Sequence, residues 1–202
     1  MSVRYSIAPA QEQHLHALAG IERAAAQLLR AFAPSSVLAE TTDDESFRRA
    51  VANGNLWVAL DHETPVGFAL VEMLSESSPH LSEIDVHPAY GRRGLGTALV
   101  RAVCEWAADS GYPEVTLTTF RAVPWNMPFY SRLGFEEMPT DTVSPQVNAV
   151  VRDETARGLD PRTRVVMSYR THAPSNGKGG GRPDGAKNTY TDPVRDAATG
   201  VP

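Results

Sequence analysis

The feature that most restricts the fold of this 202-residue chain is a glycine-rich loop between a strand and a helix. The loop, Gly91–Thr97, follows the alternating run Leu81–His87 and opens a helix predicted over Leu95–Ser110. A second β-rich run covers Glu114–Phe120. Strand, helix and strand in this order form a crossover, and its two strands must be parallel and nearly adjacent in one sheet. The chain is therefore predicted to be an α/β protein.

The same loop has the chemistry of a phosphate site. Glycine lets the backbone approach a ligand closely, and the first turn of a helix offers free N–H groups and a positive dipole end. Arg92 and Arg93 add two positive charges there. The order G-x-x-G-x-G differs from the dinucleotide motif, and no Gly-Lys-Ser/Thr ending marks a P-loop. We therefore predict a pyrophosphate ligand of another kind.

Hydrophobic periodicity predicts the other elements. Helices are expected over Gln11–Phe32, from Thr42 to Ala52, from Pro124 to about Gly134 and over Ser144–Gly158. Strands are expected over Val3–Ile7, Leu56–Leu60, Val66–Met73, from Phe135 and over Arg164–Tyr169, with loops over Pro34–Thr42 and Ser75–His80. The three strands before the glycine loop read as a meander. The sheet is therefore expected to be mixed (α+β), with about six to seven strands flanked by helices.

Composition narrows the class of protein. A net charge of −5 gives no sign of the basic face that binds nucleic acid. The single cysteine, Cys104, excludes an internal disulfide and is expected as a buried thiol, and no cysteine cluster indicates a metal. Neither a membrane span of about 18 apolar residues nor a signal peptide is visible, which predicts a cytoplasmic protein without a membrane partner. Residues 171–202 read as a disordered tail after a domain over residues 1–170.

The stretch from Leu81 to Phe135 resembles the GNAT superfamily of acyl-CoA-dependent N-acetyltransferases. The motifs that carry the resemblance stand in the family's order: Val86-His87-Pro88, Gly91 to Gly96, Val115 to Thr119, Asn126 with Phe129-Tyr130, and Leu133-Gly134-Phe135. One position departs from the pattern, because Gly91 stands where the family usually has Gln or Arg. Arg92 is expected to take over that charge contact.

The resemblance implies a GNAT-like sheet in which the strand carrying Val86 splays from the strand carrying Val115. Acetyl-CoA would be the co-substrate, with no metal. Its pantetheine arm would pair with the backbone of Ile84, Asp85 and Val86 like an added strand. The pyrophosphate would lie on the first turn of the helix, formed by Arg92, Arg93, Gly94, Leu95, Gly96 and Thr97. Asn126 would contact the cofactor from the far side.

Amine acetylation needs a base and an acid. An aliphatic amine has a pKa near 10.4, so making it neutral at pH 7 costs roughly 4–5 kcal/mol. Glu83 is the first candidate base and Glu72 the second, although Glu83 is also readable as a solvated edge charge. Tyr130 occupies the family's position for the acid that protonates the leaving thiolate, with a purely structural tyrosine as the alternative. His87 is expected to lie outside the cleft.

Several points stay open. Glu22 is either a charge at the edge of its helix stripe or a carboxylate that points into the substrate cleft. Residues 144–170 would complete the sheet, cover the acceptor site or form the edge of a homodimer. The leading hypothesis is acetylation of a small-molecule primary amine. The alternatives are acetylation of a protein N-terminus or lysine, and a non-catalytic CoA-binding regulatory module.

Overall fold

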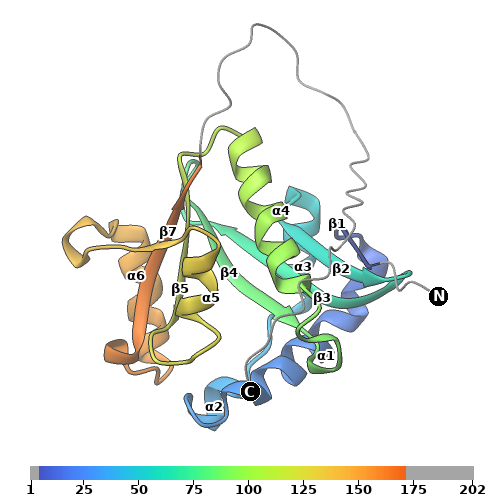
Figure 1. Cartoon of the computed structure of the whole chain (residues 1–202), viewed down its shortest axis with the longest axis horizontal. Helices are drawn as coiled ribbons and strands as arrows, with labels where there is room; N and C mark the ends of the chain where they lie inside the picture. Colours follow the sequence, from blue (N-terminus) through green and yellow to red (C-terminus); the bar gives the residue numbers. More distant parts are fainter. Residues whose placement is uncertain (1–4, 172–202) are drawn as a thin grey trace, which may run out of the picture.

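A seven-stranded mixed sheet forms the centre of the computed structural model, which describes residues 5–171 (Figure 1). The strands are β1 (Tyr5–Pro9), β2 (Leu56–Asp61), β3 (Thr64–Met73), β4 (Pro79–Val86), β5 (Glu114–Phe120), β6 (Glu136–Glu137) and β7 (Arg164–Arg170). Their order is β1-β2-β3-β4-β5-β7-β6. The β4–β5 pair is parallel and the other pairs are antiparallel, which confirms the predicted meander, crossover and mixed sheet.

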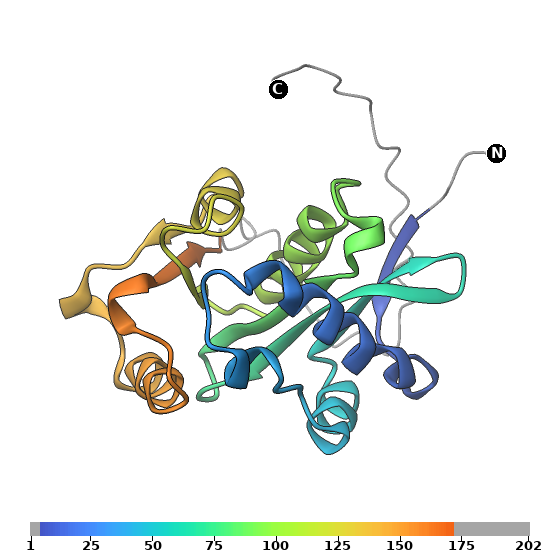
Figure 2. The same ribbon diagram turned by 90° about the horizontal axis from the view of Figure 1, so that it is seen from below.

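Helices cover both faces of this sheet (Figure 2). They are α1 (Leu15–Ala26), α2 (Ser35–Leu38), α3 (Asp44–Asn53), α4 (Leu95–Asp109), α5 (Met127–Arg132) and α6 (Pro145–Ala156). Helices α1 and α3 pack on one face through a core that includes Leu18, Phe47 and Phe68. Helix α4 packs on the opposite face, around Leu99 and Val103. These are called the α1 face and the α4 face below.

Most predicted boundaries agree with the structure, but several do not. The helix predicted to Phe32 is shorter, because α1 ends at Ala26. The predicted loop Pro34–Thr42 contains the short helix α2. The helix predicted from Pro124 begins at Met127. The predicted loop Ser75–His80 is wrong at its end, because β4 already begins at Pro79. The predicted tail lies outside the described residues apart from Thr171, and the predicted first strand lies partly outside them.

A β-bulge interrupts β4. Leu70 of β3 pairs with Glu83, but the next residue, Val71, pairs with Leu81, so Ser82 is an extra residue in β4. A bulge of this kind shifts the alternation of side chains by one position. Which face of the sheet each residue of β4 lies on therefore depends on the bulge as well as on the normal alternation of a strand.

The bulge gives β4 one apolar and one polar side. After the bulge, Ile84 and Val86 pack against the core on the α4 face. His80, before the bulge, and Glu83, after it, pair with Glu72 and Leu70, which are two residues apart on β3. Residues two apart on a strand share a face, so His80, Glu83 and Asp85 all face α1.

Strands β4 and β5 separate soon after they meet. They pair only at His80 with Thr116 and at Leu81 with Leu117. From Glu83 to Val86 the backbone of β4 is therefore paired with β3 alone. This region, called the β4–β5 split below, confirms the expected splayed strands.

Candidate active site

The glycine loop enters α4 through two residues with left-handed backbone. Arg92 has a φ of 60° and Gly94 a φ of 78°. Gly94 is the N-cap residue of α4, and no side chain among the described residues caps this end of the helix. The first N–H groups of α4 thus lack a side-chain acceptor from that part of the chain, which is the arrangement that binds an anion.

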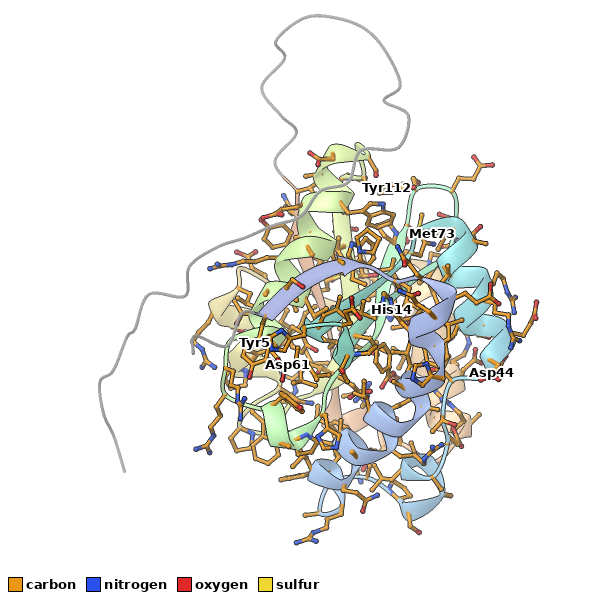
Figure 3. All side chains as sticks on the ribbon, turned by 90° about the vertical axis from the view of Figure 1, so that its right-hand side faces the viewer. Tyr5, His14, Asp44, Asp61, Met73 and Tyr112 are labelled. Carbon is orange, nitrogen blue, oxygen red and sulfur yellow. The ribbon has the colours of Figure 1, made fainter. Side chains whose placement is uncertain are left out.

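The two arginines of the loop differ in their surroundings. The Arg93 guanidinium lies 5.2 Å from the ring centre of Tyr90 and 5.8 Å from that of Tyr5. It also donates hydrogen bonds to the Tyr5 hydroxyl and, at 3.1 Å, to the carbonyl of Ala89. Figure 3 shows Tyr5, the first residue of β1, beside Asp61, the last residue of β2. Arg93 therefore ties the loop to β1, and both arginines are exposed.

The other predicted cofactor residues lie around the β4–β5 split. Ile84, Asp85 and Val86 form the edge of β4 that β5 leaves unpaired. Asn126 is the N-cap residue of α5. A side chain at Gly96 would meet the ring of Phe129 at 3.5 Å, so α5 lies against the first turn of α4.

Tyr130 reaches the split from the α4 face. Its side chain is 9% exposed, and its ring centre lies 5.0 Å from that of Phe129 and 5.8 Å from that of Phe135. Burial, followed by the charges of Glu83 and Asp85, raises the pKa of Tyr130 above its usual range. The phenol therefore stays protonated at neutral pH. Side chains from opposite faces of the sheet come within electrostatic reach of each other at the split.

Glu83 has the environment of a proton acceptor. The Glu83 side chain is half-buried on the α1 face of β4, so its carboxyl group is partly removed from water. Burial, and then the charge of Glu22, raises its pKa to about 7, although Arg164 and Arg157 act in the opposite direction. The pKa of Asp85 is also raised, by burial, by Glu83 and by Glu22. Like charges in a common site resist ionising together.

We expect Glu83→Gln to stabilise the protein at alkaline pH. The folded-state pKa of Glu83 is about 7, above its ordinary value of 4.5, so the stabilising protonated form is complete below pH 4.5 and is lost as the pH rises through 7. Glutamine does not ionise, so the variant should gain on the order of 1–3 kcal/mol over the parent at pH 8. Urea unfolding at pH 4.5 and 8 measures this, with exposed Glu72→Gln as control. An equal difference at both pH values would contradict the expectation.

Glu22 of α1 belongs to the same site. It is 8% exposed, so the interpretation as an edge charge is wrong. Both of its carboxylate oxygens accept the backbone N–H of Thr42, each at 3.0 Å, and one accepts the Thr42 hydroxyl at 3.2 Å. Burial raises its pKa in spite of these hydrogen bonds. Glu72, the second candidate base, is exposed on β3.

Sequence reasoning missed His80, which it placed in a loop. The side chain is 1% exposed, and its Nδ1 lies 2.9 Å from the Thr116 hydroxyl. Burial lowers the pKa of His80 to about 4, so the imidazole is neutral at pH 7. The polar residues before it masked the start of the strand. His80 and Glu83 are three residues apart, which would place them on opposite faces of a regular strand. The bulge between them brings them to the same face.

A second missed group covers the α1 face of β5 and β7. Buried Glu154 of α6 accepts hydrogen bonds from Arg164 of β7 at 2.6 and 2.9 Å. Arg164 also donates to Thr118 of β5 at 3.1 Å. At the rim, Arg157 pairs with Glu40 at 3.2 Å. Of the open alternatives for residues 144–170, α6 covers the sheet and β7 completes it.

Other residues lie apart from this site. Cys104 is buried, as predicted, and burial raises the pKa of its thiol to about 12. The side chain of His87 accepts the N–H of Ala89 at 3.3 Å in the loop. Asp43 caps α3 by accepting the N–H of Ser46 at 2.9 Å. In the described part of the chain, no three His, Cys, Asp or Glu side chains are grouped to hold a metal. No helix between residues 5 and 171 has the length and apolarity to cross a membrane.

The β4–β5 split and the open first turn of α4 are the arrangement expected of an acyl-CoA-dependent transferase. The model of the Acetyltransferase (GNAT) family matches residues 23–135. The chain belongs to this family and is an acetyl-CoA-dependent N-acetyltransferase.

Curated relatives are similar over part of the chain. The uncharacterized N-acetyltransferase YafP of Escherichia coli (strain K12) is 27% identical over 113 residues, 55% of this chain and 67% of that protein. N-acetyltransferase 8 of Homo sapiens is 35% identical over 88 residues, 40% of this chain and 38% of that protein. The match to the human relative thus spans well under half of its length.

Solved structures share the fold at low sequence identity. The PaiA N-acetyltransferase from Thermoplasma acidophilum, in complex with coenzyme A, has a TM-score of 0.65 at 17% identity, covering 84% of this chain and 99% of that one. The N-acetylglutamate synthase from Neisseria gonorrhoeae, in complex with coenzyme A and N-acetylglutamate, has a TM-score of 0.64 at 14% identity, covering 85% and 36%.

Proposed function

We propose that the protein transfers the acetyl group of acetyl-CoA to a primary amine of a small molecule at the β4–β5 split. The observation that carries the proposal is the β4–β5 split, with the buried Tyr130 on the α4 face and with Glu83 and Asp85 on the α1 face of β4. A protonated phenol from one face and a carboxyl group from the other are the acid and the base that the reaction needs.

Acetyl-CoA has a matching surface on this chain. The uncapped first turn of α4, Arg92 to Thr97, would hold the pyrophosphate, with Arg92 in place of the side chain that Gly91 lacks. The free edge of β4, Ile84 to Val86, would bind the pantetheine arm by strand addition. Asn126, at the start of α5, would contact acetyl-CoA from the opposite side. In this arrangement the thioester points toward Tyr130.

Glu83 is the proposed general base. An ammonium group in the site gives up a proton to the Glu83 carboxylate, and the neutral nitrogen attacks the thioester carbonyl carbon. The new C–N bond forms as the C–S bond breaks, and Tyr130 donates its proton to the departing thiolate. The second proton of the acylated nitrogen then passes to the Tyr130 phenolate, which restores the phenol. A base is most effective when its pKa is near the working pH. Glu83, with a pKa of about 7, is therefore favoured over His80, with a pKa of about 4.

The segments that lie over the α1 face of β5 and β7 favour a small acceptor. Leu159, which follows α6, packs with Phe120 of β5 and with Leu29 beyond α1. The Arg157–Glu40 ion pair joins the two sides at the rim. An amino group on the surface of a folded protein would have to pass this cover, whereas a small amine needs far less room. A protein N-terminus or lysine remains the alternative acceptor.

We expect the protein to release free thiol from acetyl-CoA in the presence of a suitable amine. A colorimetric thiol assay across primary amines of different length and charge measures this, with calorimetry for CoA binding as a parallel measurement. Thiol release with at least one amine supports the proposal. Tight CoA binding without thiol release across the panel would instead indicate a non-catalytic CoA-binding module.

A further inference from the structure

The glycine loop is fastened to a strand that lies far from it in the sheet. The loop follows β4, whereas Tyr5 begins β1, and β2 and β3 lie between these two strands. The Arg93 guanidinium donates a hydrogen bond to the Tyr5 hydroxyl across 88 residues of sequence. This contact links the start of α4 to the edge strand of the sheet.

Two tyrosine rings and a backbone carbonyl hold the Arg93 side chain. The guanidinium lies 5.2 Å from the ring centre of Tyr90 and 5.8 Å from that of Tyr5, and the two rings pack edge to face with centres 6.4 Å apart. Nη2 donates a second hydrogen bond to the carbonyl of Ala89 at 3.1 Å. Cation–π contacts and hydrogen bonds from a charged donor are stabilising even at an exposed site. Arg93, Tyr5 and Tyr90 are called the Arg93 clamp below.

The clamp lies beside the strained part of the loop. Arg92 has a left-handed backbone with a φ of 60°, which is unfavourable for a residue with a Cβ atom. Such a conformation persists only where the surrounding contacts hold it in place. Arg93 is the next residue, and its hydrogen bonds to Tyr5 and Ala89 are contacts of this kind. The turn that leads into the first N–H groups of α4 therefore depends on the clamp.

The same contacts change the role expected for Arg93. Its sequence position predicts a direct charge contact with the pyrophosphate. In the structure, both terminal nitrogens of the guanidinium are engaged by the protein, Nη1 by Tyr5 and Nη2 by Ala89. A phosphate oxygen would have to compete with these acceptors.

We infer that the Arg93 side chain positions the CoA site rather than binding the pyrophosphate itself. It holds the glycine loop against β1, so the first turn of α4 is already formed before CoA binds, and Tyr5 acts through it. Apparent affinity falls with the fraction of protein in the binding-competent conformation, so loss of the clamp lowers the affinity for CoA. The inference rests on the proposed pyrophosphate site and adds the residues that preform it.

Tyr5→Phe tests the clamp, and Tyr90→Phe is its matched control. Each removes one hydroxyl and keeps a ring beside Arg93, but the hydroxyl that accepts the hydrogen bond is that of Tyr5. Calorimetry with CoA should show a Kd at least about threefold higher in Tyr5→Phe and an unchanged Kd in Tyr90→Phe. Neither substitution alters a charge, so an Arg93 that binds phosphate directly would tolerate both. An unchanged Kd in Tyr5→Phe would overturn the inference.

A double-mutant cycle shows whether Tyr5 acts through Arg93. Arg93→Ala alone should raise the Kd for CoA, and in that background Tyr5→Phe should add less than about twofold, because the donor of the hydrogen bond is already gone. Additive losses would overturn the inference. Urea unfolding of the ligand-free variants checks that each is folded, and a loss of stability without a change in CoA affinity would show a merely structural clamp.

Kinetics with acetyl-CoA provide a second measurement. Tyr5→Phe should raise the KM for acetyl-CoA at least about threefold and leave kcat unchanged, because the clamp acts on binding and not on the reacting groups. A lower kcat at an unchanged KM would contradict the inference. Failure of the proposed function shows differently, as CoA binding without thiol release from any amine, and the comparison of CoA affinities still decides the role of the clamp.

Discussion

Replacing Tyr130 with Phe is expected to lower kcat by about 10²–10³ and to leave the Kd for CoA nearly unchanged. The substitution removes only the hydroxyl, so the ring contacts with Phe129 and Phe135 remain. Without the phenol, the thiolate must leave unprotonated or take its proton from water. Steady-state kinetics with acetyl-CoA and the best amine, together with calorimetry for CoA, measure the two quantities.

Tyr169→Phe is the matched control for this experiment. Tyr169 of β7 packs against Phe135, with ring centres 5.4 Å apart, so it belongs to the same aromatic cluster as Tyr130. Its loss of a hydroxyl should change kcat little. If Tyr130→Phe were as active as the parent, the proton donor would have to be another group, and the proposed role of Tyr130 would be abandoned.

Gly94→Val should raise the Kd for CoA by at least about 100-fold. A left-handed backbone costs a residue with a Cβ roughly 1–2 kcal/mol, and a branched side chain adds bulk at the proposed pyrophosphate site. The space around Gly94 is open, because no described residue beyond its chain neighbours comes within 4 Å of the place that a Cβ would take. A valine there would therefore clash with a bound pyrophosphate rather than with the protein. Calorimetry or fluorescence titration with CoA measures the loss.

The same helix offers a control that separates strain from ligand binding. Gly111, at the other end of α4, has the same φ of 78° and equally open space around it. Gly111→Val should therefore lose a similar amount of stability, about 1–2 kcal/mol, but keep its affinity for CoA. Equal CoA affinities in the two variants would show that the first turn of α4 is not the pyrophosphate site.

Much of the fold was predictable from local sequence. The predicted strand Glu114–Phe120 has the observed bounds, and α4 ends one residue before the predicted Ser110. Both follow from side-chain periodicity and from glycines at the ends of the helix, which depend only on near neighbours in the chain. The glycine loop and Tyr130 were likewise identified from short motifs.

The neighbours of the candidate site were less predictable. Glu22 had two possible interpretations, because a charge beside an apolar stripe has the same sequence pattern whether it faces solvent or a strand. The environment of Glu83 was left open for the same reason, and His80 was assigned to a loop. Each outcome depends on which distant segment covers the side chain, and periodicity carries no information about that.

The sequence by itself determined the class of fold, the position of the glycine-rich turn and the place of Tyr130 in its motif. These features lie within single strands, helices and loops, and local backbone preferences set the conformation of such elements. Only the tertiary structure decided that Glu22 of α1 is buried over β4, which carries Glu83 and Asp85, and that α6 covers β5 and β7. The physical reason is that burial and charge coupling arise between segments brought together by the bulge in β4, the split from β5 and the packing of α1.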